Sequence, residues 1–256
     1  PRRKDDFVIQ YLRDHPGESG IIYCATRKNV DKLQELLTEY SFAATKYHAG
    51  LSAEARRKNQ NDFIYDTAPV IVATNAFGMG IDKSNVRFVL HYNMPQSMEN
   101  YYQEAGRAGR DGLPSQCVLL FSAQDVIINK FLLDKKDFAE MDDEEADLLR
   151  QRDLQRLQTM ERYCQTTECL RNYILAYFGE HPTAPCGNCG SCKGNFQSVD
   201  ITREAQIILS CVKRVHDALG YNVGANLLGN ILRGSRNKRV QELGLDKIST
   251  YGLLKD

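Results

Sequence analysis

Apolar runs alternate with stretches of helical periodicity over residues 1–133. Five apolar runs are predicted to form strands, at residues 20–25, 43–47, 69–74, 86–90 and 117–121. Between them, apolar side chains recur three or four residues apart, and Thr26, Ser52 and Ser97 are candidate caps of three such helices. Strands that lack polar alternation and are separated by helices are typical of a parallel sheet covered on both faces. The pattern therefore predicts an α/β domain over residues 1–133.

The helical pattern changes after residue 133. Residues 142–165 are predicted to form one long helix, and residues 170–177 a second helix that makes a hairpin with it. The acidic run that begins the first helix is interpreted as a solvated N-terminus, where carboxylates complement the helix dipole. Residues 186–194 are rich in glycine and have too little apolar content to pack without a ligand. We assign residues 134–200 to a second domain.

The last part of the chain, residues 201–256, has apolar positions at helical spacing around Cys211 and Ile231. They predict the short helices of a third domain. The formal net charge of the chain is +0, but acidic side chains are in excess over residues 134–200 and basic ones after residue 200. The neutral total therefore does not exclude a nucleic-acid partner.

Composition excludes some classes of protein. Of the 256 residues, 42% are hydrophobic and 26% are charged, which is close to the globular average and argues against disorder. No apolar run reaches the roughly 18 residues of a membrane span, and the first residues are charged, unlike a signal segment. We therefore expect a soluble, intracellular protein without a membrane partner. The chain starts at Pro1 just before a helical pattern, so we expect Pro1 to be a cut inside a longer protein.

The cysteines are unevenly placed. Eight cysteines in an intracellular chain argue against a disulfide framework, and five of them lie between residues 164 and 192. Cys24 and Cys117 fall within predicted strands and are interpreted as core residues. The cluster, in contrast, requires a metal or a cofactor.

The motif Cys186-x-x-Cys189-x-x-Cys192 places three thiolates on one glycine-broken loop, a pattern typical of a metal site. A tetrahedral site needs a fourth ligand, and by distance along the chain Cys169 or Cys164 could supply it. The same triple opens some iron–sulfur motifs, but the further Cys-Pro of those motifs is absent, which favours zinc.

Two arginines stand out at the end of the α/β domain, in the stretch QEAGRAGRDG at residues 103–112. Arg107 and Arg110 are three residues apart, so we expect them to share one helical face at the edge of the sheet. Guanidinium groups are suited to stabilising charge on a transferred phosphoryl group, and a surface ion pair is the alternative. Upstream, a glycine loop between Thr74 and Asp82 lacks the third glycine of a dinucleotide fingerprint, which excludes an NAD site.

Four stretches, taken in order, resemble the second motor domain of superfamily 2 helicases: YCATR at 23–27, YHAGL at 47–51, AFGMGIDK at 76–83 and NYYQEAGRAGRDG at 100–112. With the four-cysteine module and the third domain, the chain is most similar to the RecQ family of ATP-dependent DNA helicases. The resemblance implies a RecA-like parallel sheet with helices on both faces over 1–133, a helical-hairpin zinc-binding domain with four cysteine ligands over 134–200, and the truncated, N-terminal part of a winged-helix (RQC) domain over 201–256.

The resemblance also implies roles for residues of the motor domain. Arg107 and Arg110 would be catalytic residues that reach the γ-phosphate of ATP, which is bound with Mg²⁺. The nucleotide would also meet Gly80, Asp82 and Gln103, with Asp82 at the ribose. The tracked single strand of DNA would contact Arg27, His48 and Thr74. For His48 a hydrogen bond that orders its own loop is an equal alternative.

Outside the motor domain, the resemblance implies a structural zinc ion bound by Cys169, Cys186, Cys189 and Cys192, and leaves Cys164 to pack against a neighbouring helix. In the third domain, the segment from Leu232 to Arg239 combines cations, a hydroxyl and an amide where a turn opens a helix, which suits it to duplex phosphates. A solvated basic helix start is the alternative. The DNA-binding residues predicted there are Arg233, Ser235, Arg236 and Lys238.

The sequence has no Gly-x-x-x-x-Gly-Lys-Ser/Thr loop and no acidic Mg²⁺-binding box. We therefore expect the C-terminal portion of an ATP-dependent 3′→5′ DNA helicase of repair or recombination, inactive alone and completed by an upstream RecA-like domain. Single-stranded and forked duplex DNA are the expected partners, in the cytoplasm and nucleoid of a bacterium or the nucleus of a eukaryote. A non-enzymatic zinc and winged-helix DNA-binding adaptor and an RNA-directed helicase are the alternatives.

Overall fold

The computed structural model describes residues 3–75, 77, 82–135, 142–194, 196 and 199–255. The chain divides into two compact units, residues 1–194 and residues 195–256. We describe each unit by itself. No helix in the described part of the chain is both long enough and apolar enough to cross a membrane.

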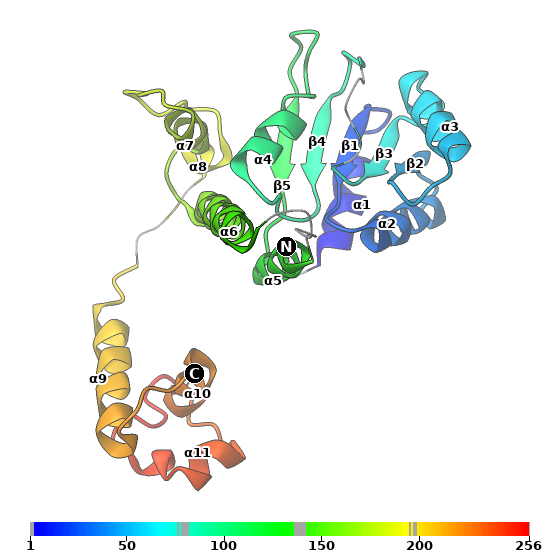
Figure 1. Ribbon diagram of the computed structural model, residues 1–256. Helices are drawn as coiled ribbons and strands as arrows, with labels where there is room; N and C mark the ends of the chain where they lie inside the picture. The colour runs from blue at the N-terminus through cyan, green and yellow to red at the C-terminus, as the bar shows by residue number, and fades with distance from the viewer. Residues whose placement is uncertain are drawn as a thin grey trace. The chain divides into compact units, whose positions relative to one another are not determined.

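A parallel sheet of five strands organises the first unit (Figure 1). The order across the sheet is β2-β3-β1-β4-β5, and every neighbouring pair is parallel. The predicted strands are confirmed, with ends that differ by up to a few residues. Their bounds are β1 Gly20–Tyr23, β2 Ala44–Tyr47, β3 Val70–Ala73, β4 Phe88–His91 and β5 Gln116–Leu119.

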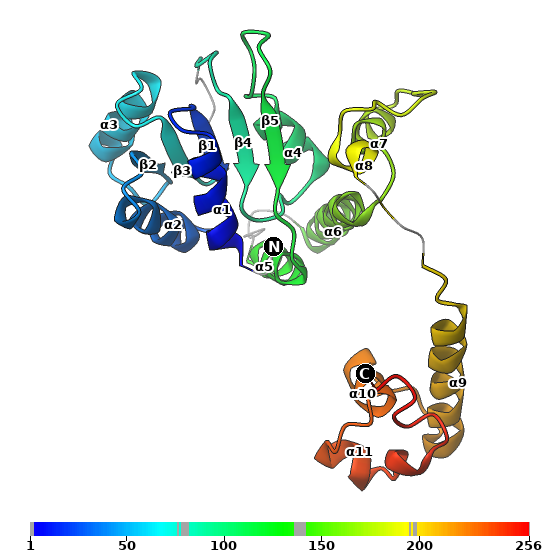
Figure 2. The same cartoon turned by 180° about the vertical axis from the view of Figure 1, so that it is seen from behind.

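Helices cover both faces of this sheet, as the sequence predicts. Helices α1 (Lys4–Asp14) and α2 (Arg27–Glu39) pack with Ile22 and alternate residues of the neighbouring strands. The opposite face, which includes Ile21, packs against α3 (Ala53–Ile64). Successive residues of a strand point to opposite faces, so the unbroken apolar strands supply both cores. Figure 2 shows α1 and α2 from the other side of the sheet.

Hydroxyl side chains begin the three helices for which the sequence predicts a cap, and this confirms the predicted caps. Thr26 accepts a hydrogen bond from the backbone N–H of Asn29 at 3.2 Å, and Ser52 and Ser97 make the equivalent bonds at the starts of their helices. Each bond satisfies an N–H that has no partner within the helix. Ser97 opens α4 (Met98–Ala105).

Helices that follow the sheet form a third apolar cluster. Its helices are α4, α5 (Ala123–Asp134), α6 (Asp143–Gln165) and α7 (Leu170–Tyr177), followed by the short α8 (Gly190–Lys193). Met98 and Tyr101 of α4 pack in this cluster with Leu157 and Met160 of α6. Residues of the first two predicted domains therefore share one core. The predicted boundaries at 133 and 200 remain proposals.

One expectation about this unit was only partly right, and another is confirmed. Cys24 is buried in the core, but Cys117, on the edge strand β5, is exposed. The acidic run is a helix N-terminus as expected, with Asp142 capping α6 through a 2.8 Å bond from the N–H of Glu145.

The second unit is built from the helices that the periodicity predicts. They are α9 (Thr202–Leu219), α10 (Ala225–Leu232) and α11 (Lys238–Glu242), followed by a 3₁₀ turn at Leu245–Lys247. Cys211, Ile231 and Val240 are completely buried at the centre of its core. Gly220 ends α9 with a left-handed backbone (φ +77°), a conformation that glycine adopts without steric cost.

Candidate functional site

Three predicted DNA-binding residues follow the carboxyl ends of β1, β2 and β3. Arg27 is exposed at the start of α2, whereas His48 after β2 and Thr74 after β3 are buried. Arg27 and His48 both lie against Gly50. A Cβ added at Gly50 would be only 3.1 Å from His48 Nδ1 and 3.3 Å from Arg27 Cδ, so the two side chains are close to each other. The backbone N–H of Thr74 donates to the carbonyl of Tyr47 at 3.2 Å. The three loops therefore lie together at the carboxyl end of the parallel strands.

His48 orders its own loop. Its Nδ1 accepts from the N–H of Gly50 at 3.1 Å, which leaves Nε2 to carry the proton and donate to Asp31 at 3.2 Å. Lys46 donates to the same carboxylate at 2.7 Å and is the main cause that holds the pKa of Asp31 below its usual value. The loop-ordering hydrogen bond is thus present, and a DNA contact by His48 stays a prediction.

A cavity of about 270 Å³ opens beside these loops. It lies at the carboxyl ends of the neighbouring strands β1 and β4. After β1 the chain crosses to one side of the sheet, toward β2, and after β4 it crosses to the other side, toward β5. In open parallel sheets, ligands commonly bind at such a point. Asn93 lines it and fixes the segment before Arg27, since its Oδ1 accepts from the N–H of Ala25 and from Asn29 Nδ2. Sequence reasoning missed Asn93, because a single asparagine after a strand carries no pattern.

The arginine pair lies on a turn and not on a helix, so the expected shared helical face is wrong. Helix α4 ends at Ala105, and residues 106–111 form consecutive turns. Gly109 explains the change: its φ is +67°, its N–H donates to the carbonyl of Val86 at 2.9 Å, and a Cβ there would lie 2.5 Å from Ser115 Oγ. The sequence of small residues therefore ends the helix and folds the segment against the sheet.

A third arginine, Arg87, holds the turn in place. Arg87 donates to both oxygens of Asp111 at 2.6 Å, and this pairing is the main cause of a lowered pKa of Asp111. Arg107 is half-buried and Arg110 is exposed. Both lie close enough to Tyr23 of β1 for their positive charges to lower the pKa of its phenol, against the larger effect of burial, which raises it.

Only part of the predicted nucleotide site falls within the described residues. Asp82 and Gln103 are exposed, whereas Gly80 lies outside the described residues. The residue after Asp82 was missed by sequence reasoning: the buried Lys83 donates to Asp66 at 2.8 Å and to the carbonyl of Ile64 at 3.3 Å. Lys83 therefore anchors the end of the loop that carries Asp82.

The four predicted metal ligands converge. The Sγ atoms of Cys169, Cys186, Cys189 and Cys192 all lie within 4.8 Å of one another. Two of the pairs are 3.9 Å and 4.0 Å apart. Four thiolates around a tetrahedral zinc ion, at Zn–S distances of about 2.3 Å, would be about 3.8 Å apart, so the donor set fits zinc.

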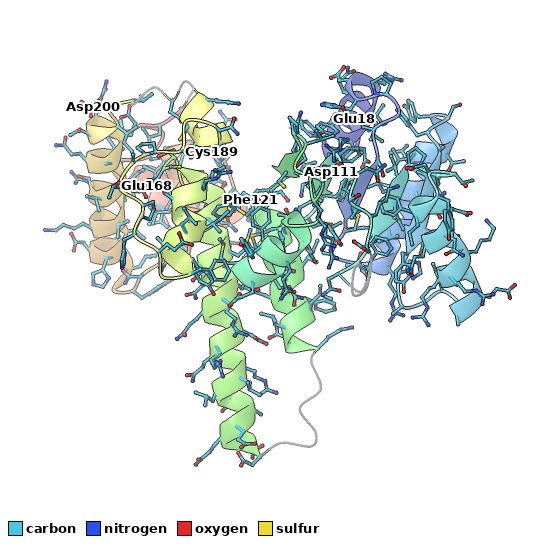
Figure 3. All side chains as sticks on the ribbon, turned by 90° about the horizontal axis from the view of Figure 1, so that it is seen from above. Glu18, Asp111, Phe121, Glu168, Cys189 and Asp200 are labelled. Carbon is cyan, nitrogen blue, oxygen red and sulfur yellow. The ribbon has the colours of Figure 1, made fainter. Side chains whose placement is uncertain are left out.

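Backbone N–H groups point at these sulfur atoms, as expected for thiolates. The N–H of Cys186 donates to Cys169 Sγ at 3.3 Å and lowers the pKa of that thiol, and the N–H of Leu170 donates to Cys189 Sγ at 3.3 Å. Figure 3 labels Cys189, which begins α8. Cys164 packs against the cluster of α4 to α7, and burial raises the pKa of its thiol to about 12, which suits a packing role.

The predicted basic segment of the second unit joins α10 to α11. The side chains of Arg233, Arg236 and Lys238 are exposed. Lys238 Nζ lies 3.5 Å from Glu242 Oε1. The backbone of Ser235 is fixed by a 2.8 Å bond from its N–H to the carbonyl of Asn230. The segment therefore presents cations from a backbone of defined shape.

Three family models match consecutive parts of the chain. They are the helicase conserved C-terminal domain at residues 3–112, the RecQ zinc-binding domain at 123–193 and the RQC domain at 195–256. The fold and the cysteine site thus agree with a RecA-like domain, a structural zinc module and an RQC domain.

Similar proteins cover nearly the whole chain. The ATP-dependent DNA helicase RecQ of Bacillus subtilis is 46% identical over 98% of this chain, and that of Haemophilus influenzae is 40% identical over 97%. A putative ATP-dependent RNA helicase of Acanthamoeba polyphaga mimivirus is 34% identical over 96%. The chain spans 41%, 38% and 44% of the lengths of these relatives. The chain therefore belongs to the RecQ family and corresponds to its C-terminal region.

Proposed function

We propose that this chain is the C-terminal portion of an ATP-dependent 3′→5′ DNA helicase that acts in DNA repair or recombination. The observation that carries the proposal is the position of the arginine turn. Arg107 lies close enough to Tyr23, the last residue of β1, for its charge to act on the pKa of that phenol, and the loops with Arg27 and Thr74 begin at the same end of the strands. Groups suited to ATP and groups suited to a DNA backbone thus occur on one small domain.

In the proposed ATPase site, Arg107 and Arg110 stabilise the charge that builds up on the γ-phosphate during transfer. Gly80, Asp82 and Gln103 bind the nucleotide, with Asp82 at the ribose. Mg²⁺ would neutralise charge on the β- and γ-phosphates, and its ligands would come from an upstream RecA-like domain of the same protein. In this arrangement the present chain contributes the arginines but not the phosphate-binding loop.

Two sets of residues would contact DNA. Arg27 and Thr74 would hold phosphates of the tracked single strand, with His48 on the DNA side of the same loops. The basic segment of the second unit would hold phosphates of the duplex ahead of the fork. Phosphate contacts fix position and carry no sequence information, which suits a helicase that must move along any sequence. With DNA as the partner, an intracellular location follows, in the nucleoid or in the nucleus.

The test uses the protein with its upstream domain. We expect ATP hydrolysis that single-stranded DNA stimulates, and unwinding of a forked DNA duplex that exceeds unwinding of the matching RNA duplex. A preference for RNA would replace the proposal with the RNA-directed alternative. A protein that binds forked DNA but hydrolyses no ATP would be the adaptor.

A substitution in the basic segment tests the proposed duplex contact. Arg236→Ala is expected to weaken binding of the chain to duplex DNA and to reduce the slope of log affinity against log salt by about 1, because one phosphate contact releases about one counterion. The matched control is Arg203→Ala, which removes an exposed charge from α9. Equal losses in the two variants would mean that net charge matters and the segment does not.

A further inference from the structure

Asp125, in the first turn of α5, is a carboxylate buried to 1% exposure. Its Oδ2 accepts hydrogen bonds from Lys4 Nζ at 2.7 Å and from the backbone N–H of Ser122 at 2.8 Å. Its Oδ1 accepts from Asn93 Nδ2 at 2.8 Å. Lys4 balances the buried charge and also donates to two backbone carbonyls, one just after β4 and one just after β5. The carboxylate therefore has a fixed position beside the carboxyl ends of these strands.

This carboxylate determines which way the amide of Asn93 points. An ionised carboxylate only accepts hydrogen bonds, so the NH₂ group of Asn93 must face Asp125. The amide oxygen of Asn93 is then turned toward α2, where it accepts from the backbone N–H of Ala25 and from Asn29 Nδ2, each at 3.1 Å. Asn93 is itself buried. A buried charge on α5 thus fixes a hydrogen-bond acceptor for the segment that joins β1 to α2.

The two bonds to Asn93 lie on either side of Arg27 in the chain. Ala25 comes two residues before Arg27, and Asn29 comes two residues after it. Asn29 is held a second time, because its backbone N–H donates to the cap Thr26 at 3.2 Å. Arg27 is the first residue of α2 and its side chain is exposed. The backbone that carries this exposed cation is therefore fixed to the end of β4, while the guanidinium faces solvent.

We propose that Asn93, oriented by Asp125, is a positioning residue for the tracked strand of DNA: it fixes the first turn of α2 so that Arg27 is in place before a phosphate arrives. The inference rests on the proposed contact between Arg27 and DNA. Asn93 touches no DNA in this arrangement. A segment that is already ordered loses less conformational entropy on binding, so the contact made by Arg27 is stronger than it would be from a loose loop.

The test is a double-mutant cycle between Asn93→Ala and Arg27→Ala in the protein with its upstream domain. Each single variant is expected to raise the Kd for a single-stranded oligothymidylate roughly fivefold, because one charge-assisted phosphate contact is misplaced or lost. In the Arg27→Ala background, Asn93→Ala should have little further effect, since it acts through Arg27. Fluorescence anisotropy of the labelled oligonucleotide measures all four affinities.

The matched control is Asn129→Ala. It removes another buried amide, whose Nδ2 donates to the carbonyl of Met94 at 2.8 Å, and should leave the Kd unchanged. Equal losses of affinity in the two asparagine variants, or additive losses in the cycle, overturn the inference. Asp125→Asn has nearly the same shape as the wild type but no longer dictates the orientation of Asn93. It should weaken binding in the same non-additive way, and it provides the test if Asn93→Ala does not fold.

A second measurement does not depend on DNA. In the 256-residue chain, the backbone amide proton of Ala25 should exchange with water faster in Asn93→Ala than in the wild type, as followed by NMR. Unchanged exchange overturns the inference. The proposed DNA contact fails separately: if Arg27→Ala leaves the Kd unchanged, Arg27 does not contact DNA and the inference falls with it. A loss in Arg27→Ala without one in Asn93→Ala removes only the role of Asn93.

Discussion

Arg107→Ala is expected to lower kcat for ATP hydrolysis by about 10³-fold in the protein with its upstream domain, the low end of what arginine fingers contribute. The guanidinium is proposed to meet negative charge that grows only in the transition state, so its loss should reduce kcat more than it raises KM. Unwinding, which consumes ATP, should be abolished. DNA affinity should be nearly unchanged. A steady-state ATPase assay measures the loss of hydrolysis, and a strand-separation assay measures the loss of unwinding.

Arg110→Ala should give a loss of similar size, because the two arginines share one turn. Arg13→Ala is the matched control. Arg13 lies near the end of α1, just before β1 begins, and its guanidinium lies over the ring of Tyr40 at 5.6 Å. It therefore lies near the amino ends of the strands, whereas the loops of the candidate site follow their carboxyl ends. Near-normal turnover in both site variants would refute the catalytic assignment, and a similar loss in Arg13→Ala would point to a general effect of charge.

The sheet and its helices could be predicted because each is specified locally. Apolar runs such as Ile21-Ile22-Tyr23, bounded by turns, are typical of strands buried on both faces, and a hydroxyl at Thr26 or Ser52 marks where a helix can begin. The cysteine site was predictable for a similar reason. Three of its four ligands lie within seven residues, from Cys186 to Cys192, so spacing alone brings them together.

The features that sequence reasoning missed depend on contacts between distant segments. Spacing places Arg107 and Arg110 on one helical face, but helix α4 ends before them and Gly109 bonds to Val86, shortly before β4. The apolar run around Cys117 predicts a buried side chain, whereas Cys117 is exposed on the edge strand β5. Lys83 forms an ion pair with Asp66, and the sequence pattern of neither segment predicts this contact. Such pairings are set by the topology, which the local pattern does not contain.

Cys189→Ser is expected to remove zinc from the chain and to unfold the zinc module. Helix α7 has no fully buried residue, and few apolar side chains lie between it and α8, so this region has little packing to replace the metal. In small zinc modules the free energy of metal binding is largely folding free energy, about 10–16 kcal/mol in isolated fingers. Metal analysis should fall from about one zinc ion per chain to substoichiometric levels, and hydrogen exchange should increase over residues 170–194.

The matched control is Cys164→Ser. Cys164 also lies in the cysteine-rich segment, but its thiol packs against the cluster of α4 to α7 and stands outside the group of four sulfur atoms. This variant should keep its zinc and lose only about 1 kcal/mol of stability, from the hydroxyl placed among apolar neighbours. A Cys189→Ser chain that retained one zinc ion would remove Cys189 from the ligand set. If the purified wild-type protein were brown, the assignment of zinc would be wrong and the four thiolates would bind an iron–sulfur cluster. Four thiolates can bind either group, and only the zinc site is colourless.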